Sequence, residues 1–143
     1  MNHDDVEILF AEDSIDDAAL AIRALTKSGF TNKIRHVKDG AEALDFIYCT
    51  GAYAARNRLQ YPKLILLDLK MPKVTGMEVL EKIKSDPELK SIPVVILTSS
   101  KEDPDIKKCY ALGANSYIVK PVDSDKFFHA IKEIGMYWLI LSE

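Results

Sequence analysis

The chain has 143 residues, a length typical of one domain with a substantial buried core. Nearly half of the residues are hydrophobic, 29% are charged and the net charge is −3, which indicates a globular protein and speaks against nucleic-acid binding. No run approaches the ~20 apolar residues that span a bilayer, and the N-terminus is acidic where a secretory signal would be basic, so we expect a cytoplasmic protein with no membrane partner.

Short apolar runs alternate with longer segments of helical periodicity, a pattern typical of βα units. The expected strands are Val6–Ala11, Lys33–Val37, Leu64–Asp68, Val94–Thr98 and Ser116–Val119. The expected helices begin at Ser14, Gly40, Gly76, Asp103 and Asp123, and the first four end near Gly29, Thr50, Asp86 and Gly113. Five such units predict a single α/β domain over residues 1–143, without an output domain. Its architecture is a doubly wound, flavodoxin-like parallel sheet of strand order 2-1-3-4-5 with five helices.

Three of the helix starts carry capping signals. Ser14-Ile-Asp-Asp17 reads as a capping box at the start of the first helix. Asp103 precedes Pro104, a favourable residue for a first helical turn, and Asp123 precedes the last helix. We therefore expect Asp103 and Asp123 to act as N-caps.

Polar side chains lie at the carboxyl ends of four of the five predicted strands. These residues are Glu12-Asp13, Asp68, Thr98-Ser99 and Lys120-Pro121. Ligands of open parallel sheets bind outside the carboxyl ends of the strands, so we expect these residues to face one crevice. Each carboxylate alone would be an ordinary helix cap or a solvated loop charge, but three together require compensation. Two like charges 4 Å apart repel by roughly 4 kcal/mol at an effective dielectric of 20.

Lys120 offsets one negative charge, and a divalent cation would offset the rest. Few protein oxygens are available, which favours Mg²⁺ over Ca²⁺ because Mg²⁺ keeps several waters and binds one or two carboxylates plus a phosphate. Mn²⁺ satisfies the same ligands. A cation beside an exposed carboxylate, a lysine and a threonine hydroxyl suits phosphoryl transfer, in which an aspartate can be the covalent acceptor. The histidines are scattered and Cys49 and Cys109 lack metal-type spacing, so no other nucleophile competes.

Four segments resemble the receiver domains of two-component response regulators. They are Glu12-Asp13, Leu66–Gly76, Pro93–Ser99 and Lys120-Pro121, in the family's order and spacing. The resemblance covers essentially the whole chain. The chain is most similar to small single-domain regulators that pair with bacterial phytochrome-type histidine kinases, and the longer segment Cys49–Pro62 points to that branch.

The resemblance implies Asp68 as the phosphoacceptor. Asp13, Asp68 and the backbone carbonyl of Lys70 would bind the cation directly, and Glu12 would act through a bound water. Such a protein catalyses only its own phosphorylation and dephosphorylation, so we do not expect an enzyme acting on another substrate.

The resemblance also assigns the remaining site residues. Lys120 would pair with the phosphoryl oxygens, and Thr98 would donate a hydrogen bond to one of them. The Lys120–Pro121 peptide bond would be cis. Tyr117 would move inward as Thr98 moves, which would change the face formed by the fourth helix, fifth strand and fifth helix, although an aromatic residue there is as often plain packing.

Three other functions compete with this interpretation. A hydrolase that forms an aspartyl phosphate would need a second aspartate at position 70, where this chain has lysine, and a cap domain. A flavin-binding domain would need a Ser/Thr/Gly-rich phosphate loop after the first strand. The remaining alternative is a receiver-like scaffold or interaction module that is not phosphorylated, which would be expected to lose an acid, the lysine or the threonine.

The expected partners are a sensor histidine kinase, a downstream phosphotransfer or effector protein, and a second copy of the chain. The homodimer prediction depends on Met136–Leu141, which is apolar at every position. A helix that is hydrophobic on all sides must be buried on more than one side. We expect a homodimer centred on Tyr137, Trp138, Leu139 and Ile140, with a fold-back over the sheet edge as the alternative.

Overall fold

The computed structural model describes residues 6–27 and 33–135. Five parallel strands form one sheet in the order β2-β1-β3-β4-β5, which confirms the predicted topology. The strands are β1 (Ile8–Ala11), β2 (Ile34–Val37), β3 (Leu64–Asp68), β4 (Val94–Thr98) and β5 (Ser116–Val119). The helices are α1 (Ile15–Lys27), α2 (Gly40–Tyr48), α3 (Gly76–Lys84), α4 (Asp105–Leu112) and α5 (Ser124–Glu133), with a short 3-10 helix η2 (Gly51–Tyr53).

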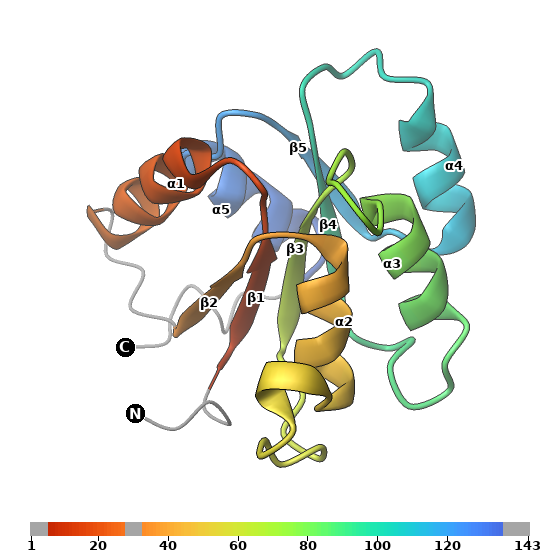
Figure 1. The fold of residues 1–143 in the computed structure, drawn as a ribbon. Coiled ribbons are helices and arrows are strands. Elements are labelled where there is room, and N and C mark those ends of the chain that lie inside the picture. Colours follow the sequence, from red (N-terminus) through yellow and green to blue (C-terminus); the bar gives the residue numbers. More distant parts are fainter. Residues whose placement is uncertain (1–5, 28–32, 136–143) are drawn as a thin grey trace.

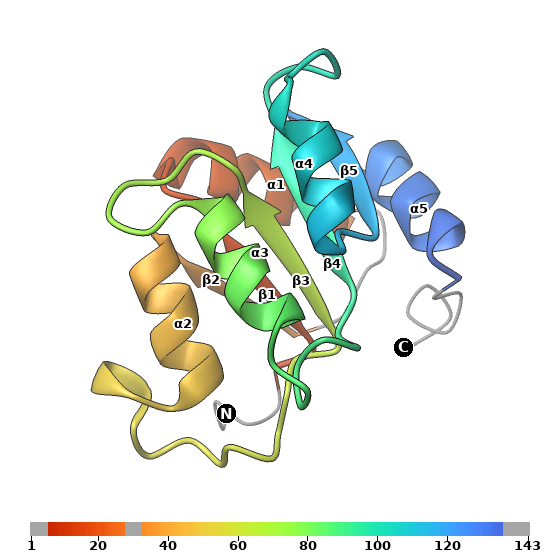
Figure 2. The ribbon, with the colours of Figure 1, turned by 90° about the vertical axis from the view of Figure 1, so that its right-hand side faces the viewer.

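Helices cover both faces of the sheet (Figures 1 and 2). Helices α1 and α5 pack on one face, and α2, α3 and α4 pack on the other. The central strand β3 shows why its sequence is apolar throughout: Leu64 and Leu66 lie in the core beneath α1 and α5, whereas Ile65 and Leu67 lie in the opposite core. A parallel strand buried on both faces has no polar side.

Ser14 and Asp123 act as N-caps, as predicted, but Ser14 does not form the predicted capping box with Asp17, because its own N–H donates to Glu12 Oε2 at 3.2 Å. The Ser14 hydroxyl accepts a hydrogen bond from the backbone N–H of Asp17 at 3.1 Å, and the Asp123 carboxylate accepts one from Lys126 at 2.9 Å. The predicted N-cap of the fourth helix is wrong by one residue, because α4 begins at Asp105 and its N-cap is Pro104. The Asp103 carboxylate accepts the N–H of Asp105 at 2.9 Å, and this local turn precedes the helix instead of being part of it.

Two helices end earlier than the periodicity predicts. Helix α2 ends at Tyr48 because Cys49 adopts a left-handed conformation with φ of 58°, which stops the helical hydrogen bonds. Helix α3 ends at Lys84, one residue before Ser85. Its start is fixed by a capping box between Thr75 and Glu78, which was not among the predicted caps.

The segment after α2 is attached to the core by two side chains. Tyr53 is 3% exposed, and Arg56 is 7% exposed. The Arg56 guanidinium lies 4.0 Å from the centre of the Phe46 ring and donates a hydrogen bond to the Phe46 carbonyl oxygen at 3.0 Å. The segment therefore packs beside α2, away from the carboxyl ends of the strands (Figure 2).

The last helix, α5, packs its apolar side against the sheet. Phe127 and Ile131 are fully buried, and Ile134 packs against the same core. The residues predicted to form a dimer, Tyr137, Trp138, Leu139 and Ile140, lie outside the described residues. The homodimer therefore stays a prediction. No helix within residues 6–27 and 33–135 combines the length and apolar character that a bilayer span requires.

Candidate functional site

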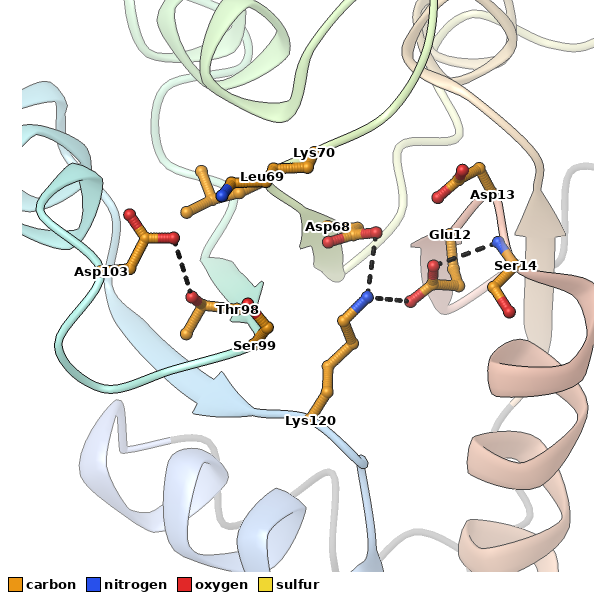
Figure 3. A pocket seen from close by; sticks show the side chains of 10 residues that line it. All are labelled: Glu12, Asp13, Ser14, Asp68, Leu69, Lys70, Thr98, Ser99, Asp103 and Lys120. Atoms are coloured by element: carbon orange, nitrogen blue, oxygen red, sulfur yellow. Dashed lines mark hydrogen bonds and ion pairs between the residues drawn. The ribbon is translucent and has the colours of Figure 1, made fainter.

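The carboxyl ends of four strands meet around one pocket (Figure 3). Glu12 and Asp13 follow β1, Asp68 is the last residue of β3, Thr98 is the last residue of β4, and Lys120 follows β5. The strands are parallel, so their carboxyl ends lie at the same edge of the sheet. Side chains that are separated by more than a hundred residues, such as Glu12 and Lys120, thereby come within hydrogen-bonding distance.

Three carboxylates form the acidic part of the pocket. Glu12, Asp13 and Asp68 each present an oxygen, and these oxygens all lie within 4.8 Å of one another. Glu12 is 1% exposed and Asp68 is 3% exposed, whereas Asp13 is exposed to solvent. The predicted cluster is therefore assembled, with two buried acids behind one that solvent reaches directly.

Lys120 connects two of these carboxylates. Its Nζ atom lies 3.2 Å from Glu12 Oε1 and 3.2 Å from Asp68 Oδ2, and it lies 4.0 Å from Asp17 Oδ2 at the edge of the site. Burial lowers the pKa of Lys120, but the neighbouring charges of Asp68 and Glu12 outweigh this effect and leave the pKa above its ordinary value. The lysine is therefore a permanent cation in the pocket.

One lysine does not balance three carboxylates. When Glu12, Asp13 and Asp68 are ionised, Lys120 leaves two negative charges uncompensated. Hard divalent cations such as Mg²⁺ and Mn²⁺ bind carboxylate oxygens, and a charge of +2 matches this excess. Lys70 also lines the pocket and is exposed to solvent. The residues present therefore fit a small divalent cation.

The buried carboxyl of Glu12 has a strongly perturbed affinity for protons. Burial and, next, the adjacent Asp68 carboxyl raise the pKa of Glu12 to about 7. The Glu12 carboxylate also accepts a hydrogen bond from the Ser14 N–H at 3.2 Å, which acts in the opposite direction. Without a cation, a large fraction of Glu12 therefore remains protonated near neutral pH.

This raised pKa predicts that protons compete with the cation. We expect the affinity for Mg²⁺ to increase by up to about tenfold between pH 6 and pH 8, because one carboxyl must lose its proton with a pKa of about 7. The same shift affects the stability of the metal-free fold. The contribution of Glu12 to this stability is fully present below pH 4.5, its ordinary pKa, and is lost as the pH rises through about 7.

Calorimetric Mg²⁺ titrations at a series of pH values measure the first effect. Thermal unfolding without Mg²⁺ over the same pH range measures the second. The control is Glu12→Gln, which cannot titrate and should show a flatter dependence over this range. An affinity for Mg²⁺ that is equal at pH 6 and pH 8 would contradict the raised pKa.

The backbone around Asp68 is closely packed by the start of α3. The N–H of Gly76 donates to the Leu69 carbonyl oxygen at 3.0 Å, and a Cβ atom at position 76 would lie 2.1 Å from the Asp68 carbonyl oxygen. Real Cβ atoms do not approach oxygen so closely, so only glycine fits. Gly76 therefore fixes the position of the strand end that carries Asp68.

The Thr98 hydroxyl is directed into its own loop. Thr98 Oγ1 lies 3.1 Å from the Ser100 carbonyl oxygen and 3.2 Å from Asp103 Oδ2, and Figure 3 shows this side chain beside Asp103. Thr98 was predicted to line the pocket, whereas Asp103 was predicted only as a helix cap. Its position five residues after Thr98, in a loop at the carboxyl end of a strand, was the signal that could have identified it.

Tyr117 and Pro121 lie beside the pocket without lining it. The Tyr117 ring is half-buried and packs edge-to-face against Tyr110 of α4, with 6.3 Å between ring centres. The Lys120–Pro121 peptide bond is cis, as the resemblance implied. The Lys120 backbone N–H donates to the Thr98 carbonyl oxygen at 2.7 Å, so β4 and β5 remain paired up to the pocket.

The fold and the pocket together define a flavodoxin-like α/β domain with an acidic, cation-binding type of site. A family model described as the response regulator receiver domain matches residues 8–132. The chain belongs to the response regulator receiver family.

One curated relative matches the chain over most of its length. Response regulator Rcp1 of Synechocystis sp. is 39% identical over 132 residues, which cover 92% of this chain and 88% of Rcp1. A crystal structure of Rcp1 in its Mn²⁺-bound form superposes with a TM-score of 0.73, at 38% identity, and covers 92% of this chain and 93% of that one.

Two further solved structures share the fold over nearly the whole chain. The bacteriophytochrome response regulator RtBRR is 47% identical with a TM-score of 0.86, and the match covers 95% of this chain and 81% of RtBRR. The phosphorylated cyanobacterial phytochrome response regulator RcpA is 38% identical with a TM-score of 0.72, and the match covers 96% of this chain and 95% of RcpA.

Proposed function

We propose that this receiver accepts a phosphoryl group on Asp68 from a sensor histidine kinase, in a reaction that requires Mg²⁺ or Mn²⁺. The observation that carries the proposal is the position of the Asp68 carboxylate. It lies 3.2 Å from the Lys120 ammonium and shares the pocket with Glu12 and Asp13, whose oxygens lie within 4.8 Å. The relatives Rcp1, in an Mn²⁺-bound form, and RcpA, in a phosphorylated form, support the same chemistry.

The transfer is a nucleophilic displacement at phosphorus. An oxygen of the Asp68 carboxylate attacks the phosphorus atom of a phosphohistidine, and the bond from phosphorus to the imidazole nitrogen breaks. The electron pair of that bond stays on the imidazole, which takes up a proton from water. Asp68 is suited to this role because it is held by the strand end and Lys120 while its pocket opens to solvent beside Asp13.

The other residues of the pocket would hold the cation and contact the phosphoryl group. Asp13, Asp68 and the Lys70 carbonyl would hold the cation, with Glu12 acting through a bound water. When bound, the cation supplies positive charge against the phosphoryl oxygens. Lys120 exchanges its contact with Asp68 for one with a phosphoryl oxygen and keeps Glu12 as its second partner.

The signal would leave through Thr98 and Tyr117. Thr98 moves toward the phosphoryl group and donates its hydroxyl proton to an oxygen of that group. Tyr117 follows into the space that Thr98 leaves, which alters the contact with Tyr110 and hence the face formed by α4, β5 and α5.

A phytochrome-type kinase is the proposed input partner. RtBRR and RcpA are both phytochrome response regulators, and their similarity extends over at least 95% of this chain. A comparison of phosphoryl-transfer rates from the histidine kinases of the same genome would identify the partner. The alternative of a scaffold that is not phosphorylated is disfavoured, because Asp68, Thr98 and Lys120 all line the pocket.

Beryllofluoride, a stable phosphoryl analogue, tests the proposal without a kinase. We expect it to bind saturably only when Mg²⁺ is present. This binding should raise the melting temperature, because beryllofluoride binds the folded protein and not the unfolded chain. Lys120→Gln should weaken this binding, whereas the matched charge change Lys101→Gln, on the exposed loop after β4, should not. Equal binding with and without Mg²⁺, or no binding to the wild type, would contradict the proposed function.

A further inference from the structure

Asp103 lines the pocket, and the reaction described above gives it no role. It lies in the loop between β4 and α4, five residues after Thr98, and is half-buried. Its two carboxylate oxygens have different partners. Oδ1 accepts the backbone N–H of Asp105 at 2.9 Å, and Oδ2 accepts the Thr98 hydroxyl at 3.2 Å (Figure 3).

The Thr98 hydroxyl is held entirely by this loop in the part of the chain that the structure describes. Its oxygen lies 3.1 Å from the Ser100 carbonyl oxygen and 3.2 Å from Asp103 Oδ2, and it accepts the Ser100 N–H at 3.4 Å. A hydroxyl has one proton to donate. To donate that proton to a phosphoryl group on Asp68, Thr98 must give up its hydrogen bond to Asp103.

We propose that Asp103 is a positioning residue that holds Thr98 in the unphosphorylated arrangement and opposes its movement toward Asp68. The inference rests on the proposed function of Asp68 and Thr98. A hydrogen bond to a charged acceptor is stronger than one to a neutral group, so Asp103 is a more effective competitor for the Thr98 proton than the Ser100 carbonyl. Without Asp103, the threonine reaches the phosphoryl position with less free-energy cost.

The second carboxylate oxygen extends the effect to α4. Asp105 is the first residue of this helix, and its N–H remains bound to Asp103 Oδ1 when Thr98 departs. Asp103 thus connects Thr98 directly to the start of α4. Movement of Thr98 removes one of the two contacts that fix the carboxylate, which links occupancy of the pocket to the loop before the helix.

Substitution by serine separates the two contacts. Asp103→Ser keeps one short acceptor that can cap the N–H of Asp105 and removes the oxygen that binds Thr98. We expect beryllofluoride, with saturating Mg²⁺, to bind this variant about tenfold more tightly than the wild type, the factor that corresponds to one charge-assisted hydrogen bond. Asp103→Ala removes both contacts and should also increase the affinity for beryllofluoride. This second variant keeps the test valid where the serine perturbs the loop.

Removing a negative charge near an anion would also tighten binding, so the test includes backgrounds that remove the hydroxyl. In Thr98→Val, which keeps the shape but not the hydroxyl, Asp103→Ser should leave the beryllofluoride affinity unchanged. In Thr98→Ser, which restores a hydroxyl, the tightening should return. Glu102→Gln removes one charge from an exposed side chain of the same loop and is the matched control.

The outcomes separate this inference from the function on which it rests. Tightening by Asp103→Ser that is equal in the wild-type and Thr98→Val backgrounds would show a general charge effect and overturn the positioning role. No tightening in the wild-type background would also overturn it while leaving Asp68 as acceptor. A wild-type protein that does not bind beryllofluoride would overturn the proposed function, and this inference with it.

Discussion

Replacement of Asp68 by asparagine is expected to reduce acid-labile phosphorylation, from acetyl phosphate or from a histidine kinase, to the background of the assay. The amide keeps the shape of the side chain but has no charged oxygen that could attack phosphorus. Incubation with radiolabelled donor in the presence of Mg²⁺, followed by separation of the protein, measures the effect. Labelling of the variant at the wild-type level would place the acceptor elsewhere.

The fold of this variant should be retained. Glu12, Asp13 and Asp68 together exceed the single charge of Lys120, so neutralising one carboxylate lowers the repulsion within the pocket. Circular dichroism and the melting temperature without Mg²⁺ test this. Asp17→Asn is the matched control, because this exposed carboxylate also lies near Lys120, at 4.0 Å, but does not line the pocket.

Replacement of Asp13 by alanine is expected to abolish the stabilisation of the protein by Mg²⁺. A cation present at 100 times its Kd stabilises a folded site by about 2.7 kcal/mol. For a domain of this size, that free energy corresponds to a rise in Tm on the order of 10 °C. Asp13 is the exposed carboxylate of the cluster, so its loss removes a cation ligand without leaving a cavity in the core.

Thermal unfolding with and without Mg²⁺ measures this effect in both proteins. Glu81→Ala removes an exposed carboxylate from α3, and its response to Mg²⁺ should match that of the wild type. The metal-free Tm of Asp13→Ala should stay close to that of the wild type. A rise in Tm on Mg²⁺ addition that survives in Asp13→Ala would show that the cation binds elsewhere.

Much of the site was predictable because it depends on two regular features of the sequence. The apolar runs that end at Asp68 and Thr98 mark central strands, and the helical segments between them require parallel crossovers. Parallel strands bring their carboxyl ends to one edge of the sheet. Residue type and position along the strand therefore sufficed to predict that Glu12, Asp68 and Lys120 lie together. In the structure, Lys120 Nζ lies 3.2 Å from a carboxylate oxygen of each acid.

Element boundaries were less predictable because single-residue backbone conformations decide them. The periodic pattern of α2 continues to Thr50, but the left-handed conformation of Cys49 ends the helix at Tyr48. Likewise, Asp103 was expected to cap α4 directly, and instead it closes a separate turn onto Asp105. Neither conformation has a periodic signal that a sequence pattern could carry.

The sequence by itself determined the strand order, the residues at the carboxyl ends of the strands and the excess of negative charge among them. Only the tertiary structure decided how these groups are partnered. Burial and the nearby Asp68 carboxyl raise the pKa of Glu12 to about 7, which depends on surroundings that no linear spacing specifies. The hydroxyl of Thr98 donates to Asp103 because the loop after β4 brings that carboxylate within 3.2 Å, a contact that depends on the three-dimensional path of the loop.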